Sequence, residues 1–488
     1  DVSREETFCN TRTRHAIEFD LAAGVDKEGK LVAKDMHSYS NQGAYASHGH
    51  AIAANGLTSW RLQYACPNIR GEAYTIYTNT PVGGAMRGYG IPQVCFAIEC
   101  FMDDVAEAIH MDPLEFRRKN LIEGYYEDRY LKPIAANTNG IFECLKKGAE
   151  YIHWDEKRKK YAKQTGAVRR GVGMALFSYK TGVWPISLEI AGARLSLNQD
   201  GSVQLQLGAT EIGQGADTVF SQMVAETLHT DMAHVHIQTV QDTDVSPFDT
   251  GAYASRQSFV TGTAVKHCAE ILRDKILAYA KTLLPEVDTR ELSLRDNWIW
   301  AGEEQAISLA ALAEESYYSL TNSSVLTAEV SEQVKKNTIA TGCCFAEVEV
   351  DIKLGKIKIL HIINVHDSGK LLNPQLAEMQ VHGGMSMGMG YGISEQLILD
   401  EKTGRPLNGN LLDYKLMTML DTPDIKAGFG EMDDPMGPYG NKALGEPPAI
   451  PSAPAIRNAV LHATGVAFNE NPLTPQRLID GFKKAGLI

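Results

Sequence analysis

The run Lys442-Ala443-Leu444-Gly445-Glu446-Pro447-Pro448 stands directly before an apolar, helix-like segment. A residue that precedes proline is driven out of the helical region of backbone space, so we expect Glu446 to be extended and a helix to begin near Ala449. The rigid Pro447-Pro448 corner would then hold the carboxylate on a loop in one place, as a general base requires. Taken alone, the run is better interpreted as a solvated glutamate in a proline-rich turn.

The wider sequence has the composition of an ordinary globular protein, with 44% hydrophobic and 22% charged residues. Its 488 residues are enough for two or three domains. The net charge of -13 argues against a nucleic-acid partner. No stretch reaches the roughly 18 uninterrupted apolar residues of a membrane helix. The nearest one, residues 379–399, contains polar side chains and several glycines, which predicts a helix packed closely on its neighbours.

The eight cysteines have neither the density of a disulfide framework nor the spacing of iron–sulfur ligands. Cys343 and Cys344 head a strand-like run and are predicted to be core residues. The sequence opens at Asp1 with a charged, polar stretch and not with a signal peptide, so we expect a cytoplasmic protein. Because it has no initiator methionine and enters a strand-like stretch at once, we expect it to begin partway through a larger protein.

Alternating patterns and turn signals predict the first elements. Residues 16–38 form a predicted hairpin around Asp26-Lys27-Glu28-Gly29, and residues 92–110 a predicted helix. Between them, the glycine- and histidine-rich residues 40–56 are expected to be irregular. The polar residues 123–139 are a plausible domain boundary.

Further hairpins are predicted at residues 193–207, with a turn at residues 198–201, and at residues 345–367. Strands and helices alternate without a regular βαβ rhythm, so the expected fold class is α+β. The sequence shows no internal repeat and no low-complexity tract.

A glycine-rich stretch, Gly83-Gly84-Ala85-Met86-Arg87-Gly88-Tyr89-Gly90-Ile91-Pro92-Gln93, surrounds one arginine and one aromatic residue. Glycines let the backbone approach a ligand closely, and the guanidinium offers a planar fork of donors. On its own, this stretch would be a surface loop with an ordinary ion-paired arginine.

Two more loops could hold an anion. Gly213-Gln214-Gly215 lies between a predicted strand and a predicted helix, where backbone N–H groups favour phosphate. It lacks the third glycine and the later acidic residue of a dinucleotide fingerprint, so a nicotinamide site is not expected. Residues 249–258 could be a phosphate nest or, equally, the capping region of the next helix.

Residues 367–384 form the last unusual segment. Asn373-Pro374 is predicted to start a helix, and Gln380 falls inside its apolar body. A buried glutamine needs hydrogen-bond partners, which are backbone groups (slightly preferred) or a ligand.

These five segments together resemble the molybdenum-binding subunit of the xanthine dehydrogenase family of molybdenum hydroxylases, in its bacterial form. The resemblance covers essentially the whole chain, and it is the order and spacing of the motifs that make it specific. The matching motifs include Ser3-Arg4-Glu5-Glu6, Ala85-Met86-Arg87-Gly88-Tyr89-Gly90, Asp112-Pro113-Leu114-Glu115 and Leu473-Thr474-Pro475-Gln476-Arg477-Leu478. The resemblance implies the mixed sheets and helices of the molybdenum-cofactor-binding domains. Residues 1–125 would be the C-terminal part of a first molybdopterin-binding domain, and residues 126–488 a second one.

The resemblance also implies roles for individual residues. Glu446 matches the catalytic base. Arg87 and Ala254 match positions beside the metal, which has no direct protein ligand in this class. Tyr89 matches an aromatic residue, usually Phe, that packs on the substrate, and Arg87 and Trp184 fall at or near substrate-contacting positions, although packing is the stronger interpretation for Trp184. The implied cofactor-binding residues are Gly213, Gln214, Gly215, Ala254, Ser255 and Gln380.

The implied activity is hydroxylation of a purine-like N-heterocycle of the xanthine or hypoxanthine type, with oxygen from water. The implied cofactor is molybdopterin carrying molybdenum, in its cytosine dinucleotide form. FAD and 2Fe–2S clusters would lie on a flavin subunit and an iron–sulfur subunit of an oligomer. The alternatives are another N-heterocycle or an aldehyde as substrate and, in a different class, a non-catalytic scaffold without cofactor.

Several family features are absent or displaced. The family's glycine-rich loop above the metal and its substrate-binding Glu are expected before Asp1, in a missing N-terminal half. A substrate arginine of the eukaryotic enzymes is expected near Asn55, whereas the nearest here is Arg61, which puts xanthine itself in question. Gly88 stands where carbon monoxide dehydrogenases carry a cysteine, which argues against that activity.

Overall fold

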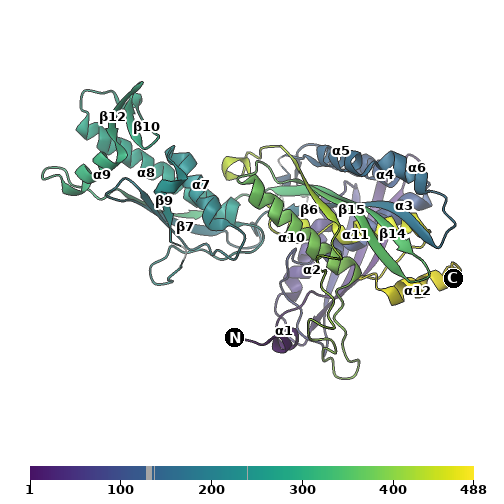
Figure 1. Ribbon diagram of the computed structural model, residues 1–488. Helices are drawn as coiled ribbons and strands as arrows, with labels where there is room; N and C mark the ends of the chain where they lie inside the picture. The colour runs from purple at the N-terminus through teal and green to yellow at the C-terminus, as the bar shows by residue number, and fades with distance from the viewer. Residues whose placement is uncertain (128–134, 137, 239) are drawn as a thin grey trace.

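The computed structural model describes residues 1–127, 135–136, 138–238 and 240–488. The molecule is elongated and has a larger main lobe and a smaller distal lobe, which residues 189–334 form around their own core (Figure 1). Both lobes combine helices with sheets, which confirms the α+β prediction. None of the helices described is long and apolar enough to cross a membrane. Residues 123–139 lie partly outside the described residues, and the division into 1–125 and 126–488 stays a prediction.

A four-stranded sheet lies at the centre of the main lobe. In sheet order its strands are β16 (Asp424–Gly430), β15 (Lys356–Asp367), β14 (Ile339–Asp351) and β6 (Val168–Lys180). Consecutive side chains of a strand point to opposite faces, so Cys343 and Cys344 enter different cores, and the core prediction for both is confirmed. One face of the sheet packs against α5 (Ile141–Ile152), the other against α10 (Pro374–Ile393) and α11 (Ser452–Thr464).

Helix α10 approaches α11 closely because it carries glycines four residues apart. A Cβ atom on Gly388 would lie 2.9 Å from the Cβ of Ser452, and one on Gly392 would lie 3.1 Å from the Cα of Ala453. Any larger side chain would push the helices apart. The close packing predicted for residues 379–399 is therefore confirmed, with the helix ending at Ile393.

The N-terminal part of the main lobe is a three-stranded sheet with helices on it. The sheet joins β1 (Ile17–Val25), β2 (Leu31–Gly43) and β3 (Asn68–Tyr77), so the predicted first hairpin is confirmed. The expectation of irregular chain at residues 40–56 is wrong, because α2 (Gly49–Leu62) occupies its second half and packs on β3 and α3 (Ile91–Ala108). The remaining elements are α1 (Arg4–Asn10), α4 (Pro113–Asn120), β4 (Tyr126–Glu127), β5 (Ala135–Ala136), α6 (Trp154–Tyr161) and α12 (Pro475–Lys484).

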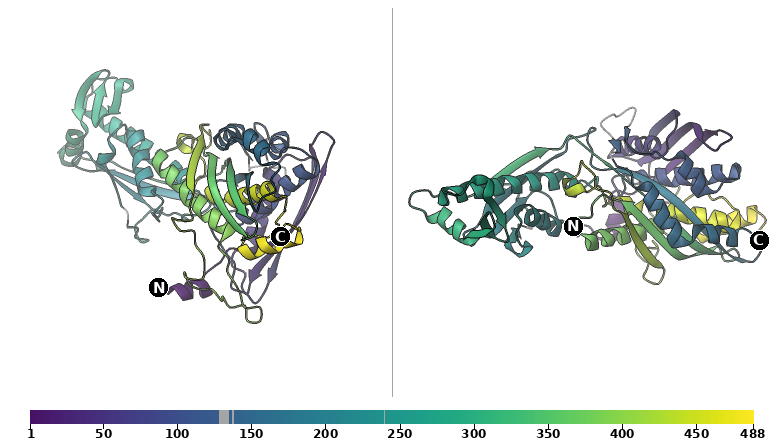
Figure 2. Two further views of the ribbon diagram at one scale, coloured as in Figure 1. Left: turned by 45° about the vertical axis from the view of Figure 1, so that its right-hand side comes forward. Right: turned by 90° about the horizontal axis from the view of Figure 1, so that it is seen from above.

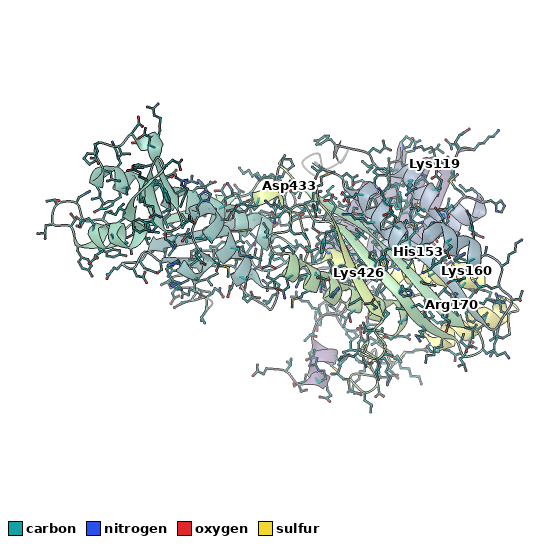
Figure 3. All side chains as sticks on the ribbon, turned by 45° about the horizontal axis from the view of Figure 1, so that its top comes forward. Lys119, His153, Lys160, Arg170, Lys426 and Asp433 are labelled. Carbon is teal, nitrogen blue, oxygen red and sulfur yellow. The ribbon has the colours of Figure 1, made fainter. Side chains whose placement is uncertain are left out.

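The distal lobe packs α7 (Ala216–Leu228) and α8 (Gly262–Leu283) on a second four-stranded sheet. That sheet has the order β13 (Thr327–Gln333), β7 (Ile190–Leu197), β8 (Val203–Leu207) and β9 (Val235–Ile237). At its far end lie α9 (Leu309–Tyr318) and a small sheet of β10 (Leu292–Arg295), β11 (Trp298–Ala301) and β12 (Glu304–Ser308). Two further views show that α7 and α8 point toward the start of α10, where the lobes meet (Figure 2). Asp433 lies at this narrow junction (Figure 3).

Candidate active site

Glu446 lies on a turn between the central sheet and α11. Its φ of -96° and ψ of -36° are helical, so the expectation of an extended residue is wrong. Pro447 and Pro448 occupy the first positions of a short 3-10 turn, where proline needs no N–H partner, and the Glu446 carbonyl accepts a bond from Ala449 N at 3.1 Å. The following helix, α11, begins at Ser452 and not near Ala449.

The Glu446 turn is fixed from the distal lobe. The Glu446 N–H donates to the Ser255 hydroxyl at 2.9 Å, and the same hydroxyl lies 3.4 Å from Glu446 Oε2. Ala254 and Ser255 have φ values of 48° and 50°, in the left-handed region that few non-glycine residues adopt. Strain of this kind persists only where the surrounding structure enforces it.

Arg256 holds the strained Ala254–Ser255 turn in place. Its guanidinium is fully buried and pairs with Glu189 and Asp249, each at 2.6 Å. The Gly251 carbonyl accepts another bond from it at 3.1 Å. Residues 249–256 are therefore held by an internal ion-pair network, and a π-helical turn at Gln257–Thr261 leads from them into α8.

Arg87 connects three segments that lie far apart in the sequence. Its Nε donates to the Gly445 carbonyl at 2.7 Å, and its Nη2 to the carbonyl of Gln380 at 3.1 Å and to Gln380 Oε1 at 3.4 Å. The glycine-rich loop, the Glu446 turn and α10 therefore meet at one guanidinium. Gln380 is partly exposed, so the expectation of a buried glutamine is wrong, although the side chain has the partner that was expected.

The glycine-rich loop rests on residues 12–15 of the N-terminal segment. Gly84 N donates to the Thr13 carbonyl at 2.9 Å, and Arg14 Nη2 donates to the Arg87 carbonyl at 2.8 Å. The Arg14 guanidinium lies over the ring of Tyr391, 5.4 Å from its centroid. Sequence inspection missed Arg14, because nothing in the run Thr11-Arg12-Thr13-Arg14 distinguishes it from a surface arginine.

The electrostatics of this cluster favour a proton acceptor. Burial raises the pKa of the Glu446 carboxyl from 4.5 to about 7, while a hydrogen bond from Gly88 and the charges of Arg87 and Arg14 act to lower it. Burial also lowers the pKa of the Arg87 guanidinium. A carboxyl with a pKa near neutrality can exchange a proton under physiological conditions, which is the property of a general acid or base.

Tyr89 lies on the same loop with its ring half-buried. Its hydroxyl is 2.7 Å from His48 Nδ1, and its carbonyl accepts a bond from Asn55 Nδ2 at 3.0 Å. Among the described residues, hydrogen bonds connect Trp184 to the site only indirectly. Its carbonyl binds Asn337, and Gly182, two residues earlier, donates to the Ala254 carbonyl at 2.9 Å. The substrate-binding role of Trp184 stays a prediction.

The loop at residues 211–217 differs from the expected anion site. Gly213 N and Gly215 N donate to Glu211 Oε1 at 2.6 and 3.1 Å, and Asp217 N donates to Glu211 Oε2 at 3.1 Å. The carboxylate of Glu211, which sequence inspection missed, thus occupies the place proposed for a phosphate. Gln214 is turned inward and binds Thr210 and Gln257. The assignment of these residues to a cofactor stays a prediction.

The Arg87 cluster, in contrast, is partly exposed, with Gly383 at the surface beside it. Gly383 presents bare backbone there, and a Cβ on it would lie 3.8 Å from Arg87 Nη1. Donors on Arg87, Gln380 and Ser255 beside such bare backbone fit an anionic cofactor with many hydrogen-bonding groups. Among the side chains described, no group of three or more His, Cys, Asp or Glu residues could hold a metal ion directly.

Comparisons with known proteins point to the same chemistry. Two family models, each of a molybdopterin cofactor-binding domain, match residues 2–121 and 147–423. A xanthine dehydrogenase molybdenum-binding subunit of Escherichia coli O157:H7 is 48% identical over 490 residues, which cover 100% of this chain and 65% of that protein. A protein named as a probable hypoxanthine oxidase of Escherichia coli K12 is 30% identical, over 99% of this chain and 50% of its own length. The chain thus spans less than two thirds of the length of these relatives.

Solved structures give the same picture of the fold. Quinoline 2-oxidoreductase from Pseudomonas putida 86 superposes with a TM-score of 0.90 at 23% identity, covering 99% of this chain and 64% of that one. At this identity the likeness concerns the arrangement of helices and sheets alone.

Proposed function

Because this chain belongs to the molybdopterin cofactor-binding domain family, we propose that it is the cofactor-holding and base-carrying part of a molybdenum hydroxylase. The proposed reaction is hydroxylation of a purine-like N-heterocycle, with the oxygen taken from water. The observation that carries the proposal is the pKa of Glu446, raised to about 7 beside Arg87 and Ser255.

The cofactor would be held by residues around this carboxyl. Ala254, Ser255 and Gln380 would contact molybdopterin, while Arg87 would lie beside the metal. Because Glu211 occupies the N–H groups of Gly213 and Gly215, residues 213–215 would contribute other backbone atoms. Gln214 would contact the cofactor only after giving up its bonds to Thr210 and Gln257. When bound, the molybdenum centre supplies the two-electron oxidising power that amino-acid side chains lack.

The chain's own residues supply proton transfer and orientation. Glu446 in its ionised form accepts a proton at its carboxylate, and the Ser255 hydroxyl at 3.4 Å from Oε2 helps to fix that carboxylate. Arg87 is held by Gly445 and Gln380, so its positive charge stays in place and stabilises negative charge that develops on a heterocycle. Tyr89 offers a flat face to a planar ring.

We further propose the cytosine dinucleotide form of the cofactor, a flavin subunit and an iron–sulfur subunit as partners, a cytoplasmic location and an oligomeric complex. These 488 residues carry neither an iron–sulfur cysteine spacing nor a dinucleotide fingerprint, so electrons would leave the site through another part of the complex. Release of cytidine monophosphate by acid treatment of the purified complex would test the cofactor form.

The test of function is Glu446→Gln in the complete complex, with the exposed Glu401→Gln as the matched control. We expect Glu446→Gln to keep its molybdenum and pterin content and to lose at least ~10²-fold in turnover of hypoxanthine, the low end for general-base catalysis. Near-normal turnover would show that Glu446 is not the general base. Freshly purified wild type without molybdenum and pterin would instead favour a non-catalytic scaffold, and faster turnover of aldehydes than of purines would favour the aldehyde alternative.

A further inference from the structure

Tyr89 is held at both ends by α2. His48 binds its hydroxyl at 2.7 Å, and Asn55, two helical turns later, binds its backbone carbonyl at 3.0 Å. The rings of His48 and Tyr89 meet edge to face, with centroids 5.6 Å apart and an interplanar angle of 87°. An aromatic ring that is fixed at its hydroxyl and at its backbone cannot swing about χ1 or tilt freely.

The backbone around Tyr89 shows that this position is enforced. Tyr89 has a φ of 43°, between Gly88 at 94° and Gly90 at 87°. A Cβ on Gly90 would lie 2.8 Å from Ile52 Cγ2, so the loop is pressed directly onto α2. A non-glycine residue in the left-handed region is strained and needs compensating contacts. The bonds from His48 and Asn55 are such contacts.

The His48 side chain binds Tyr89 and does not cap its own helix. It is the N-cap residue of α2, yet its side chain makes no capping hydrogen bond, and the imidazole turns to Tyr89. The pair lies beside the Glu446 cluster, because the backbone N–H of Gly88, the residue before Tyr89, donates a hydrogen bond to the Glu446 carboxylate. Burial raises the pKa of the Tyr89 phenol, while the charge of Arg12 lowers it and that of Glu446 raises it.

We infer that His48 is a specificity-determining residue that acts through Tyr89 and selects planar heterocycles carrying a lactam group. This inference rests on the proposed function. A phenol oxygen has one proton and two lone pairs, and the bond to His48 uses only one of these. If the hydroxyl donates to Nδ1, its oxygen can accept a ligand N–H. If Nδ1 carries the proton, the hydroxyl can donate to a ligand carbonyl. A lactam offers both groups on one ring edge, whereas an aldehyde without N–H offers only the carbonyl.

The experiment compares Tyr89→Phe, His48→Ala and their double variant in the complete complex, with hypoxanthine and benzaldehyde as substrates. His48→Asn is the conservative variant, because the Asn side chain can place a polar atom near the position of Nδ1. His50→Ala is the matched control, since His50 is exposed on the same helix two residues away. Molybdenum content is measured for each variant.

We expect Tyr89→Phe and His48→Ala each to raise KM for hypoxanthine about tenfold, the effect of one ordinary hydrogen bond, with little change in kcat. KM for benzaldehyde should stay within about twofold. The double variant should be no worse than either single one, because both remove the same interaction. His48→Asn should recover most of the loss. Equal KM changes for the two substrates, or additive effects, would overturn the inference.

A second measurement separates this inference from the proposed function. Hydrogen–deuterium exchange across residues 83–93 of the purified complex should increase in His48→Ala and stay unchanged in His50→Ala. If exchange became faster but KM for hypoxanthine did not rise selectively, His48 would have only a structural role, and the inference would be overturned. If the molybdenum-loaded wild type oxidised neither substrate, the proposed function would fail. Calorimetric titration with hypoxanthine would then decide, and equal affinities of wild type and His48→Ala would refute the selective role.

Discussion

At the scale of single residues, the proton on Glu446 links the site to the stability of the fold. Burial raises the pKa of this carboxyl from 4.5 to about 7. Between these values, the unfolded chain releases the proton that the folded protein keeps, so the stabilising contribution falls as pH rises and is gone above about 7. We expect Glu446→Gln, which resembles the protonated form, to match the wild type near pH 5 and to exceed it in stability at pH 8.

Denaturant unfolding at pH 5, 6, 7 and 8 measures this difference. Glu401→Gln removes an exposed carboxyl and should show no pH-dependent gap from the wild type. A gap for Glu446→Gln that is the same at every pH would mean that its carboxyl titrates alike in the folded and unfolded states.

Arg14 is the second residue whose charge should be visible in a titration. It lies beneath the glycine-rich loop, and its charge helps to lower the pKa of Glu446. Arg14→Met should therefore raise that pKa and move the acid limb of the kcat/KM profile to higher pH. Arg14→Lys keeps the charge and should leave the limb nearly in place, as should Arg4→Met on the exposed α1. A shift that was equal for Met and Lys would assign Arg14 a purely steric role.

Some residues of the site could be predicted from the sequence. Arg87, Gln380, Ser255 and Glu446 were singled out from four separate runs, and the structure brings them together. Their hydrogen-bond partners could not be predicted, because the bond from Arg87 to Gly445 spans 358 positions and no local pattern encodes it. His48 and Arg14 looked like any polar surface residue.

At the scale of elements, Glu211 caps the first turn of α7 from outside the helix, because Gly215, the N-cap residue, has no side chain to do so. Burial acts to raise the pKa of its carboxyl, but hydrogen bonds from Gly215, Asp217 and Gly213 prevail and hold it below its ordinary value. Glu211→Ala should lower the free energy of unfolding by about 1 to 2 kcal/mol, as for the loss of a helix cap. Because the folded pKa is depressed, this contribution is present near neutral pH and is lost as pH falls below about 4.5.

Thermal unfolding at pH 7 and pH 4 measures the effect of Glu211→Ala, and Glu226→Ala, exposed on the same helix, is the control. Hydrogen exchange at residues 211–217 should increase only in Glu211→Ala. Unchanged stability together with a gain in binding of inorganic pyrophosphate would show instead that Glu211 blocks an anion site.

The elements that the sequence predicted are those with strong local signals. The first hairpin turns at residues 26–29, and the hairpin of β7 and β8 turns where Gly201 has a φ of 80°. Helix α2 was missed because glycine and histidine are poor helix formers. Tertiary contact decides there: Gly56 lies where a Cβ would be 2.7 Å from Val94 Cγ2, so the glycine that weakens the local signal permits the packing on α3.

At the scale of the whole molecule, the site depends on how the two lobes meet. Ser255 comes from the distal lobe, whereas Arg87, Gln380 and Glu446 come from the main lobe. Polar side chains of both lobes also meet at the junction. Asn373 Nδ2 binds Gln222 Oε1 at 3.1 Å, and the Tyr439 hydroxyl donates to the Met223 carbonyl at 2.9 Å and also contacts Thr227. No local sequence pattern predicts that the residues around Glu446 come from both sides of this junction.

Tyr439→Ala should therefore loosen the junction and, although Tyr439 is not itself a site residue, weaken the Ser255–Glu446 contact. It removes a partly buried ring and its bond to α7, so we expect a loss of about 2 kcal/mol in the free energy of unfolding. Hydrogen exchange should rise at residues 249–258 and 442–449, because the Ser255–Glu446 contact would form for less of the time. Tyr45→Ala, at a side chain that is 74% exposed, is the matched control and should change neither quantity. Tyr439→Phe keeps the ring, so its losses of stability and of exchange protection should lie between those of Tyr439→Ala and Tyr45→Ala. If Tyr439→Ala lost stability while exchange at residues 249–258 and 442–449 stayed at the wild-type level, the lobes would be held by contacts other than this one, and the geometry of the site would not depend on Tyr439.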